Sequence, residues 1–157
     1  MQRERGFTFI ELVITAAILG VLAAAAMPMI ELSLQRGKEQ ELRLSLRQIR
    51  EAVDAYKKAA DEGRIARQAD ESGYPRRLEE LSAGVEDIRD PGKRKIYFLR
   101  RLPADPMFEG RAELAAETWG KRSYESSADA PKEGRDVFDV YSLSKRKGLN
   151  GIAYEQW

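Results

Sequence analysis

Glu11 is the residue whose position most directly suggests chemistry. It precedes an uncharged run from Leu12 to Ile30, and an unpaired ionised carboxylate inside a membrane costs on the order of a few kcal/mol. A cut between Gly6 and Phe7 would give Phe7 an α-amino group that is positively charged at neutral pH. Because residues four apart share a helix face, that amine could pair with Glu11 of its own chain, or with Glu11 of a neighbouring chain. The pattern predicts an ion pair, and a pair between chains would fix their relative register.

Few other residues have the types that catalysis or metal binding needs. The sequence contains neither cysteine nor histidine, which excludes disulfides and removes the commonest general base and the commonest transition-metal ligand. Ser142-Leu-Ser-Lys145 matches the Ser-x-x-Lys pattern of some acyl-enzymes. It crosses the end of an expected strand, however, and does not start a helix. We therefore expect that the protein is not an enzyme.

The run that follows Glu11 has the length of a membrane helix. Residues 12–30 carry no charge, and about 20 apolar residues span a bilayer core of about 30 Å. The flanking charges do not determine the orientation, because Arg3 and Arg5 precede the run whereas five basic residues lie between positions 36 and 50.

A secretory signal peptide is the alternative interpretation of this run. Arg3 and Arg5 would form its basic region, residues 12–21 its apolar region, and Ala24–Ala26 its cleavage site. The product would be a freely secreted protein about 20 residues shorter than the product of a cut after Gly6. The intact mass of the mature chain distinguishes the two.

The helix is expected to continue beyond the apolar run. Apolar residues recur at positions 42, 46, 49, 53, 56 and 60, and this helical spacing predicts that one face is buried. Glu62-Gly63 is the expected end, because glycine favours the conformation that closes a helix. Pro28 removes a backbone hydrogen bond and clashes with the previous turn, so a kink or a melted stretch is expected there.

The rest of the chain predicts a small antiparallel sheet. Pro75 is expected to open a short helix that Gly84 closes, with Leu78 and Leu81 facing inward. Residues 111–117 are expected to be helical. Strands are expected at residues 122–126, 136–143 and 152–157, the last of them after an Asn150-Gly151 turn. Packed on the apolar stripe, they would give an α+β fold, a long N-terminal helix against a small C-terminal sheet.

The N-terminal residues resemble the processing site of a known family. Arg3-Glu-Arg-Gly6, followed by Phe7-Thr-Phe-Ile-Glu11, is similar to the site in type IV prepilins and type II secretion pseudopilins. The resemblance implies a pilin-like fold, cleavage after Gly6 by a prepilin peptidase, and N-methylation of Phe7. It also implies that Phe7, Glu11 and Pro28 serve in filament assembly, with local unwinding at Pro28 in the filament.

Three downstream motifs resemble the major, G-type pseudopilin of type II secretion. They are Tyr74-Pro75, Leu102–Pro106 and Trp119-Gly120, although residues 107–118 separate the last two like an insertion. The resemblance implies a structural subunit of a periplasmic pseudopilus. A type IV pilin for adhesion or motility, major or minor, is the alternative within the family. A membrane-tethered periplasmic enzyme or binding domain is the alternative outside it.

The resemblance also implies a calcium site after the main strand, made of carboxylates and backbone carbonyls. Asp136, Asp139 and Ser142 are the residues in place for it. Three cations follow where acids would be expected, and they disfavour a divalent ion; they are Lys145, Arg146 and Lys147. We therefore expect no cofactor, and we expect one of these cations to clamp the loop onto Asp136 or Asp139.

A tethered domain is the organisation that the resemblance implies. Residues 1–6 would be the leader peptide, 7–30 the transmembrane and assembly helix, 31–62 its amphipathic continuation, and 63–157 the globular domain, into which 42–60 packs. The location would be the inner membrane, single-pass, with the domain in the periplasm, and then a periplasmic filament. Expected partners are further copies of the chain, other pseudopilins, the prepilin peptidase, an inner-membrane assembly platform and membrane lipid. A net charge of +1 gives no case for a nucleic-acid partner.

Overall fold

The computed structural model describes residues 8–157, apart from the side chain of Ala25. Gly6 and Phe7, the predicted processing residues, lie outside this range. The chain forms two compact units, one up to Gly37 and one from Lys38 to Trp157.

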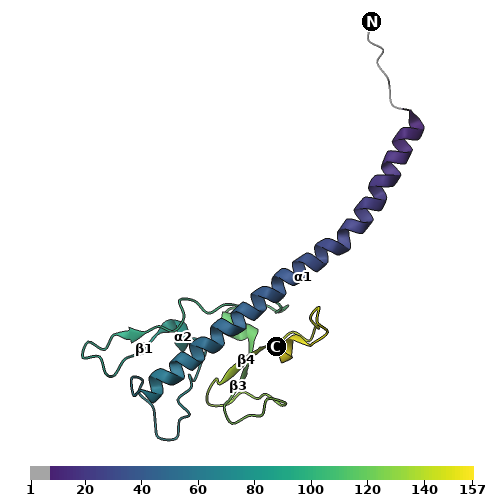
Figure 1. The fold of residues 1–157 in the computed structure, drawn as a ribbon. Coiled ribbons are helices and arrows are strands. Elements are labelled where there is room, and N and C mark those ends of the chain that lie inside the picture. Colours follow the sequence, from purple (N-terminus) through teal and green to yellow (C-terminus); the bar gives the residue numbers. More distant parts are fainter. Residues whose placement is uncertain (1–7) are drawn as a thin grey trace. The chain divides into compact units, whose positions relative to one another are not determined.

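The principal element is a single helix, α1, which runs from Phe9 to Asp61 and continues through Pro28 (Figure 1). The melted stretch expected at Pro28 is therefore absent from the single chain. One missing N–H removes one hydrogen bond from a helix of 53 residues, and the bonds on either side maintain the helix.

The end of α1 is the one that the sequence predicts. Gly63 adopts a positive φ of 69°. Its N–H donates to Ala60 O at 3.0 Å, and the N–H of Arg64 donates to Ala59 O at 2.9 Å. These two bonds form a Schellman motif, which pairs carbonyls that would otherwise be left open at the helix end.

The apolar stripe of α1 is buried, as predicted. All six positions are at most 7% exposed: Leu42, Leu46, Ile49, Val53, Tyr56 and Ala60. They pack in one core with residues from every later part of the chain, among them Leu81, Trp119, Val140 and Tyr154. The C-terminal half of α1 is thus the platform on which the second unit is built.

Two separate two-stranded antiparallel sheets flank this part of α1 (Figure 1). β1 (Val85–Glu86) pairs with β2 (Lys95–Ile96), and β3 (Trp119–Arg122) pairs with β4 (Asp139–Ser142). The expected α+β fold, a long N-terminal helix with small antiparallel sheets, is confirmed.

The strand limits differ from the prediction. β3 ends at Arg122, where the predicted strand begins, because the chain then turns with Ser126 N–H donating to Ser123 O at 3.1 Å. The C-terminal tail forms no third strand. It makes one bridge, between Lys147 and Ala153, and then a 3₁₀ helix, η2, from Tyr154 to Gln156.

The short helices also begin later than expected. Pro75 does not open a helix, because its carbonyl accepts the N–H of Val137 at 2.8 Å and is not available for helical bonding. α2 covers only Glu80–Ala83 and is followed by Gly84 at a φ of 79°. Leu78 and Leu81 are both fully buried, as predicted. Residues 107–118 contain a 3₁₀ helix, η1, at Ala115–Thr118.

Candidate functional site

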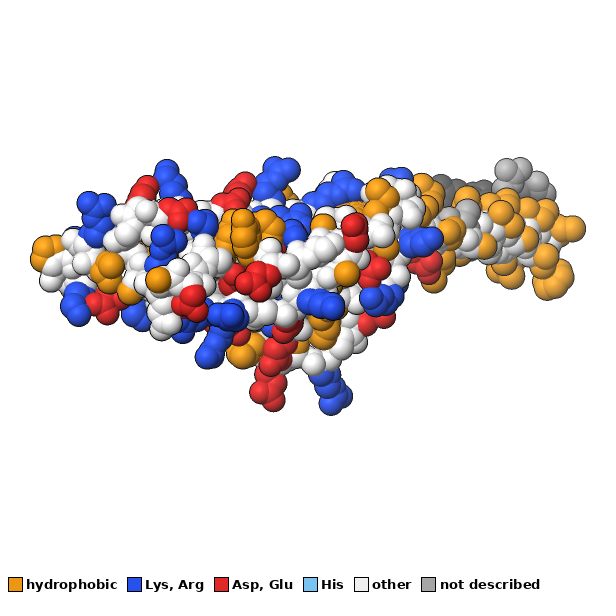
Figure 2. Space-filling view, turned by 90° about the horizontal axis from the view of Figure 1, so that it is seen from below, with side chains coloured by type: hydrophobic (Ala, Val, Ile, Leu, Met, Phe, Trp, Pro, Cys, Tyr) orange, Lys and Arg blue, Asp and Glu red, His pale blue; other side chains and the backbone are white. Residues whose placement is uncertain are grey.

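The apolar half of α1 is exposed along its described length. Large hydrophobic side chains from Phe9 to Leu34 are 44–83% exposed, and the most apolar window of the helix, long enough to cross a membrane, has none of its residues buried. Figure 2 shows hydrophobic side chains over this half of the helix. Such a helix needs lipid or other protein around it, because apolar area of this size is otherwise left in water.

Glu11 lies in the first turn of α1 and takes part in a reciprocal cap. The N–H of Thr8 donates to Glu11 Oε2 at 3.5 Å, and the N–H of Glu11 donates to Thr8 Oγ1 at 3.3 Å. This is a capping box, which satisfies two N–H groups that the helix start leaves open. The Thr8-x-x-Glu11 spacing is its signature, and the sequence analysis overlooked it. The predicted partner of Glu11, the amine of Phe7, lies outside the described residues.

The three residues in place for a calcium site all have protein partners. Asp136 accepts hydrogen bonds from Ser72 Oγ and, at 2.9 Å, from the N–H of Tyr124. Ser142 Oγ donates to Asp105 Oδ2 at 2.6 Å. Asp139 is bound by two arginines. Within residues 8–157 there is no group of three or more histidine, cysteine or acidic residues that could hold a metal ion.

The basic loop after β4 forms ion pairs, but with other partners than those predicted. Lys145 Nζ lies 2.6 Å from Glu155 Oε2, and Arg146 Nη1 lies 3.1 Å from Glu109 Oε1. The hydrogen bond from Lys145 to Glu155 raises the pKa of the lysine. The prediction that the loop is clamped onto Asp136 or Asp139 is therefore wrong, because Asp136 is bonded to Ser72 and Tyr124, and Asp139 to two arginines.

Arg50 of α1 holds the C-terminal residues and was missed by the sequence analysis. Its Nε donates to Asp139 Oδ1 at 2.8 Å. Its Nη2 donates to two backbone oxygens, Val140 O at 3.1 Å and Trp157 O at 2.8 Å. A single guanidinium therefore joins α1, β4 and the end of the described chain.

Glu39 of α1 holds the loop between β4 and η2. Its side chain is almost fully buried, and its Oε1 accepts hydrogen bonds from the N–H of Leu149 at 2.8 Å and the hydroxyl of Tyr154 at 2.9 Å. Burial of a carboxylate is costly unless it is hydrogen-bonded. The two donors supply that compensation, so the loop and the helix stabilise one another.

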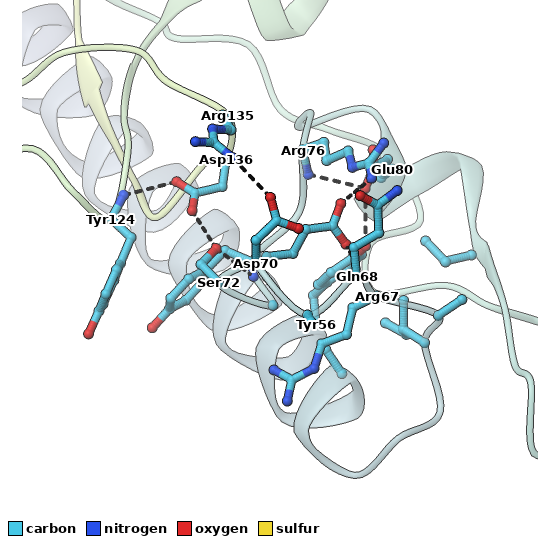
Figure 3. Close-up of a pocket in the computed structure, with 18 of the residues that line it drawn as sticks. Tyr56, Arg67, Gln68, Asp70, Ser72, Arg76, Glu80, Tyr124, Arg135 and Asp136 are labelled. Atoms are coloured by element: carbon cyan, nitrogen blue, oxygen red, sulfur yellow. Dashed lines mark hydrogen bonds and ion pairs between the residues drawn. The ribbon is translucent and has the colours of Figure 1, made fainter.

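A groove of about 1230 Å³ lies beside the end of α1 and the loop that follows it (Figure 3). Ion pairs between lining residues join Arg135 to Asp70 at 3.2 Å and Arg76 to Glu71. The backbone N–H of Gln68 and the guanidinium of Arg76 lower the pKa of Glu71. These pairs fix the loop, and the Ser72 hydroxyl of the lining donates to Asp136, which ties the loop to the segment before β4.

Known proteins match this chain both at its N-terminus and over most of its length. The family model described as the prokaryotic N-terminal methylation motif matches residues 1–27. The type II secretion system core protein G of Klebsiella pneumoniae is 32% identical over 151 residues, which cover 93% of this chain and 100% of that protein. Proteins of the same description from Pseudomonas aeruginosa and Vibrio cholerae are 29% and 28% identical over 143 residues, covering 87% and 89% of this chain and 93% and 82% of theirs. No solved structure matches the chain significantly.

Proposed function

The chain belongs to the type II secretion system core protein G family, the major pseudopilins, and on this premise we propose how its parts serve that role. A prepilin peptidase cuts after Gly6 and methylates the new N-terminus at Phe7. The processed chain waits in the inner membrane as a single-pass protein, with residues 38–157 in the periplasm. It then joins a periplasmic filament through the N-terminal half of α1.

The exposed apolar helix is the observation that carries this proposal. Hydrophobic side chains from Phe9 to Leu34 lie open along the helix, where they suit a lipid bilayer before assembly and neighbouring helices after it. Polymerisation replaces lipid by helix, so the surface stays out of water in both states.

Glu11 sets the register of the polymer in this proposal. Inside the assembled bundle its carboxylate is costly unless a cation lies close. The methylated amine of Phe7 on the adjacent copy supplies that cation. Within one chain the carboxylate is held by the N–H of Thr8, and assembly exchanges this weak bond for an ion pair.

The periplasmic domain is structural in this proposal. Its charged side chains form pairs that fix loops, as in the groove beside α1. The partners of the filament are other pseudopilins and the inner-membrane assembly platform. The role in secretion is proposed from the relatives, which are core proteins of type II secretion systems.

Substitution of Glu11 tests the proposal. Glu11→Gln, Glu11→Ala and Glu11→Val should enter the membrane at the wild-type level, because each removes a charge from an apolar segment, and should form little or no filament. Glu31→Gln is the matched control, since Glu31 is an exposed carboxylate of the same helix, and it should assemble normally. Filaments are measured in sheared fractions and by electron microscopy. Wild-type amounts of filament from all three Glu11 variants would refute the pairing.

A further inference from the structure

We propose that Arg50 takes the place of a bound calcium ion in this domain, so that the C-terminal segment is held by the chain's own cation and folds without calcium. The resemblance to major pseudopilins implies a calcium site after the main strand. The inference concerns the folding of the domain, and it does not depend on polymerisation.

The residues present do not fit a calcium ion. A calcium site gathers six to eight oxygens, with carboxylates among them. Here Asp136 is turned to Ser72 and Tyr124, and Ser142 is turned to Asp105. The loop that follows β4 contributes Lys145, Arg146 and Lys147, whose charges repel a divalent cation.

The guanidinium of Arg50 binds the classes of oxygen that calcium prefers. It donates to one carboxylate, Asp139, and to the backbone oxygens of Val140 and Trp157 at distances of 2.8–3.1 Å. A planar guanidinium offers five N–H groups in a fixed fork and stays charged at any pH relevant to the protein. One side chain therefore holds three acceptors from two distant parts of the chain.

A second arginine completes the neutralisation of Asp139. Arg122 Nη2 lies 3.2 Å from Asp139 Oδ2, so each carboxylate oxygen has its own cation. A calcium ion beside Asp139 would have to displace one arginine and would be repelled by the other. The two arginines therefore exclude a calcium ion from Asp139, and Arg50 holds the C-terminal segment in its place.

The rest of the C-terminal segment is closed by bonds that also need no metal. Lys145 pairs with Glu155 at 2.6 Å, two residues outside the antiparallel β-bridge that joins Lys147 to Ala153. The N–H of Tyr154 donates to Arg146 O at 3.1 Å. The loop is therefore tied at both ends before any ion is added.

Thermal unfolding of the full chain in detergent micelles tests the inference, followed by the fluorescence of Trp119 and Trp157. We expect the Tm of the wild type to be the same within about 1 °C in excess EGTA and in millimolar CaCl₂. Arg50→Met, which keeps the apolar stem but removes the guanidinium, should lower the Tm by about 5–10 °C. Arg47→Met is the matched control: Arg47 is exposed on the same helix, and its loss should change the Tm by about 1 °C or less.

Two results would overturn the inference. One is a rise of several degrees in the Tm of the wild type with calcium, or a matching fall with EGTA. The other is a Tm of Arg50→Met that equals the Tm of Arg47→Met. Should Arg50→Met not fold, the effect of calcium on the Tm of the wild type decides the inference. Arg50→Lys, which keeps the positive charge but loses the forked N–H groups, should then fold with a Tm below that of the wild type.

Discussion

Substitution of Glu39 should reveal how strongly α1 and the C-terminal loop stabilise one another. Glu39→Ala removes the acceptor of two hydrogen bonds, from the Tyr154 hydroxyl and from the N–H of Leu149. Hydrogen bonds to a charged group contribute about 1.5–3 kcal/mol each. Tyr154 is 0% exposed and its hydroxyl would lose its acceptor in the interior, whereas Leu149 is 43% exposed and water can reach its surroundings.

The expected loss is therefore about 2–4 kcal/mol of the free energy of unfolding. This is a large share of the 5–15 kcal/mol or so that is typical of a domain, and it corresponds to a fall in Tm of about 10 °C for a unit of this size. The measurement is urea unfolding of the full chain in detergent, followed by tryptophan fluorescence. Glu41→Ala, at an exposed position two residues away, is the control and should cost about 0.5 kcal/mol or less.

A double-mutant cycle with Tyr154→Phe isolates the hydroxyl bond. If the bond stabilises the domain, Tyr154→Phe should cost about 1–2 kcal/mol less in the Glu39→Ala background than in the wild type. The reasoning is refuted if Tyr154→Phe costs the same in both backgrounds, or if Glu39→Ala is no more destabilising than Glu41→Ala.

Two further predictions concern an ion pair and a helix cap. Arg64 donates to Asp87 Oδ2 at 2.6 and 2.9 Å and lowers the pKa of that carboxyl; because the folded value lies below the unfolded value of about 3.9, the stabilisation is present above pH 4 and lost as the pH falls through the folded value. Urea midpoints measured from about pH 6 down to pH 2 should therefore fall below about pH 4, and Asp87→Asn should make that fall shallower; an equally steep fall would contradict the assignment. Thr8→Ala should speed hydrogen exchange of the Glu11 amide about fivefold in micelles, since a cap is worth about 1 kcal/mol, whereas Thr8→Ser should leave it unchanged; equal exchange in both variants would show that the cap does not form.

Local patterns predicted the helix and its end correctly. The stripe from Leu42 to Ala60 could be read from the spacing alone, because a period of 3.6 residues puts those side chains on one face whatever lies opposite. The end of α1 at Glu62-Gly63 could also be predicted from neighbouring residues alone, since glycine adopts without strain the positive φ that the Schellman motif needs.

Contacts between distant residues decided what the sequence did not predict. The predicted turn at Asn150-Gly151 forms, with the N–H of Gly148 donating to Ile152 O at 2.8 Å. The tail after it becomes a 3₁₀ helix and not a strand, because Glu39 binds Tyr154 and Arg50 binds Trp157, across 115 and 107 positions. Pro75 suggested a helix start, yet its carbonyl pairs with the N–H of Val137. A propensity within a few residues contains no information about such partners.

The residues that hold the C-terminal segment did leave a signal in the sequence. Glu39 lies three residues before Leu42, and Arg50 lies four residues after Leu46, so both side chains lie on the edge of the buried stripe. Charged residues beside a buried stripe are mostly exposed to solvent, so their charge gave no reason to place them in the domain. Their spacing of three and four residues from the stripe predicts that both side chains reach the domain, whatever their charge.

The intact mass of the chain in the sheared filament fraction tests the central claim most directly. The account predicts a chain that begins at Phe7 and carries one methyl group on its new amine, the cation that Glu11 of a neighbouring copy is proposed to bind. A filament built from chains that still carry residues 1–6, or a mature chain that begins near Ala24–Ala26, would contradict it.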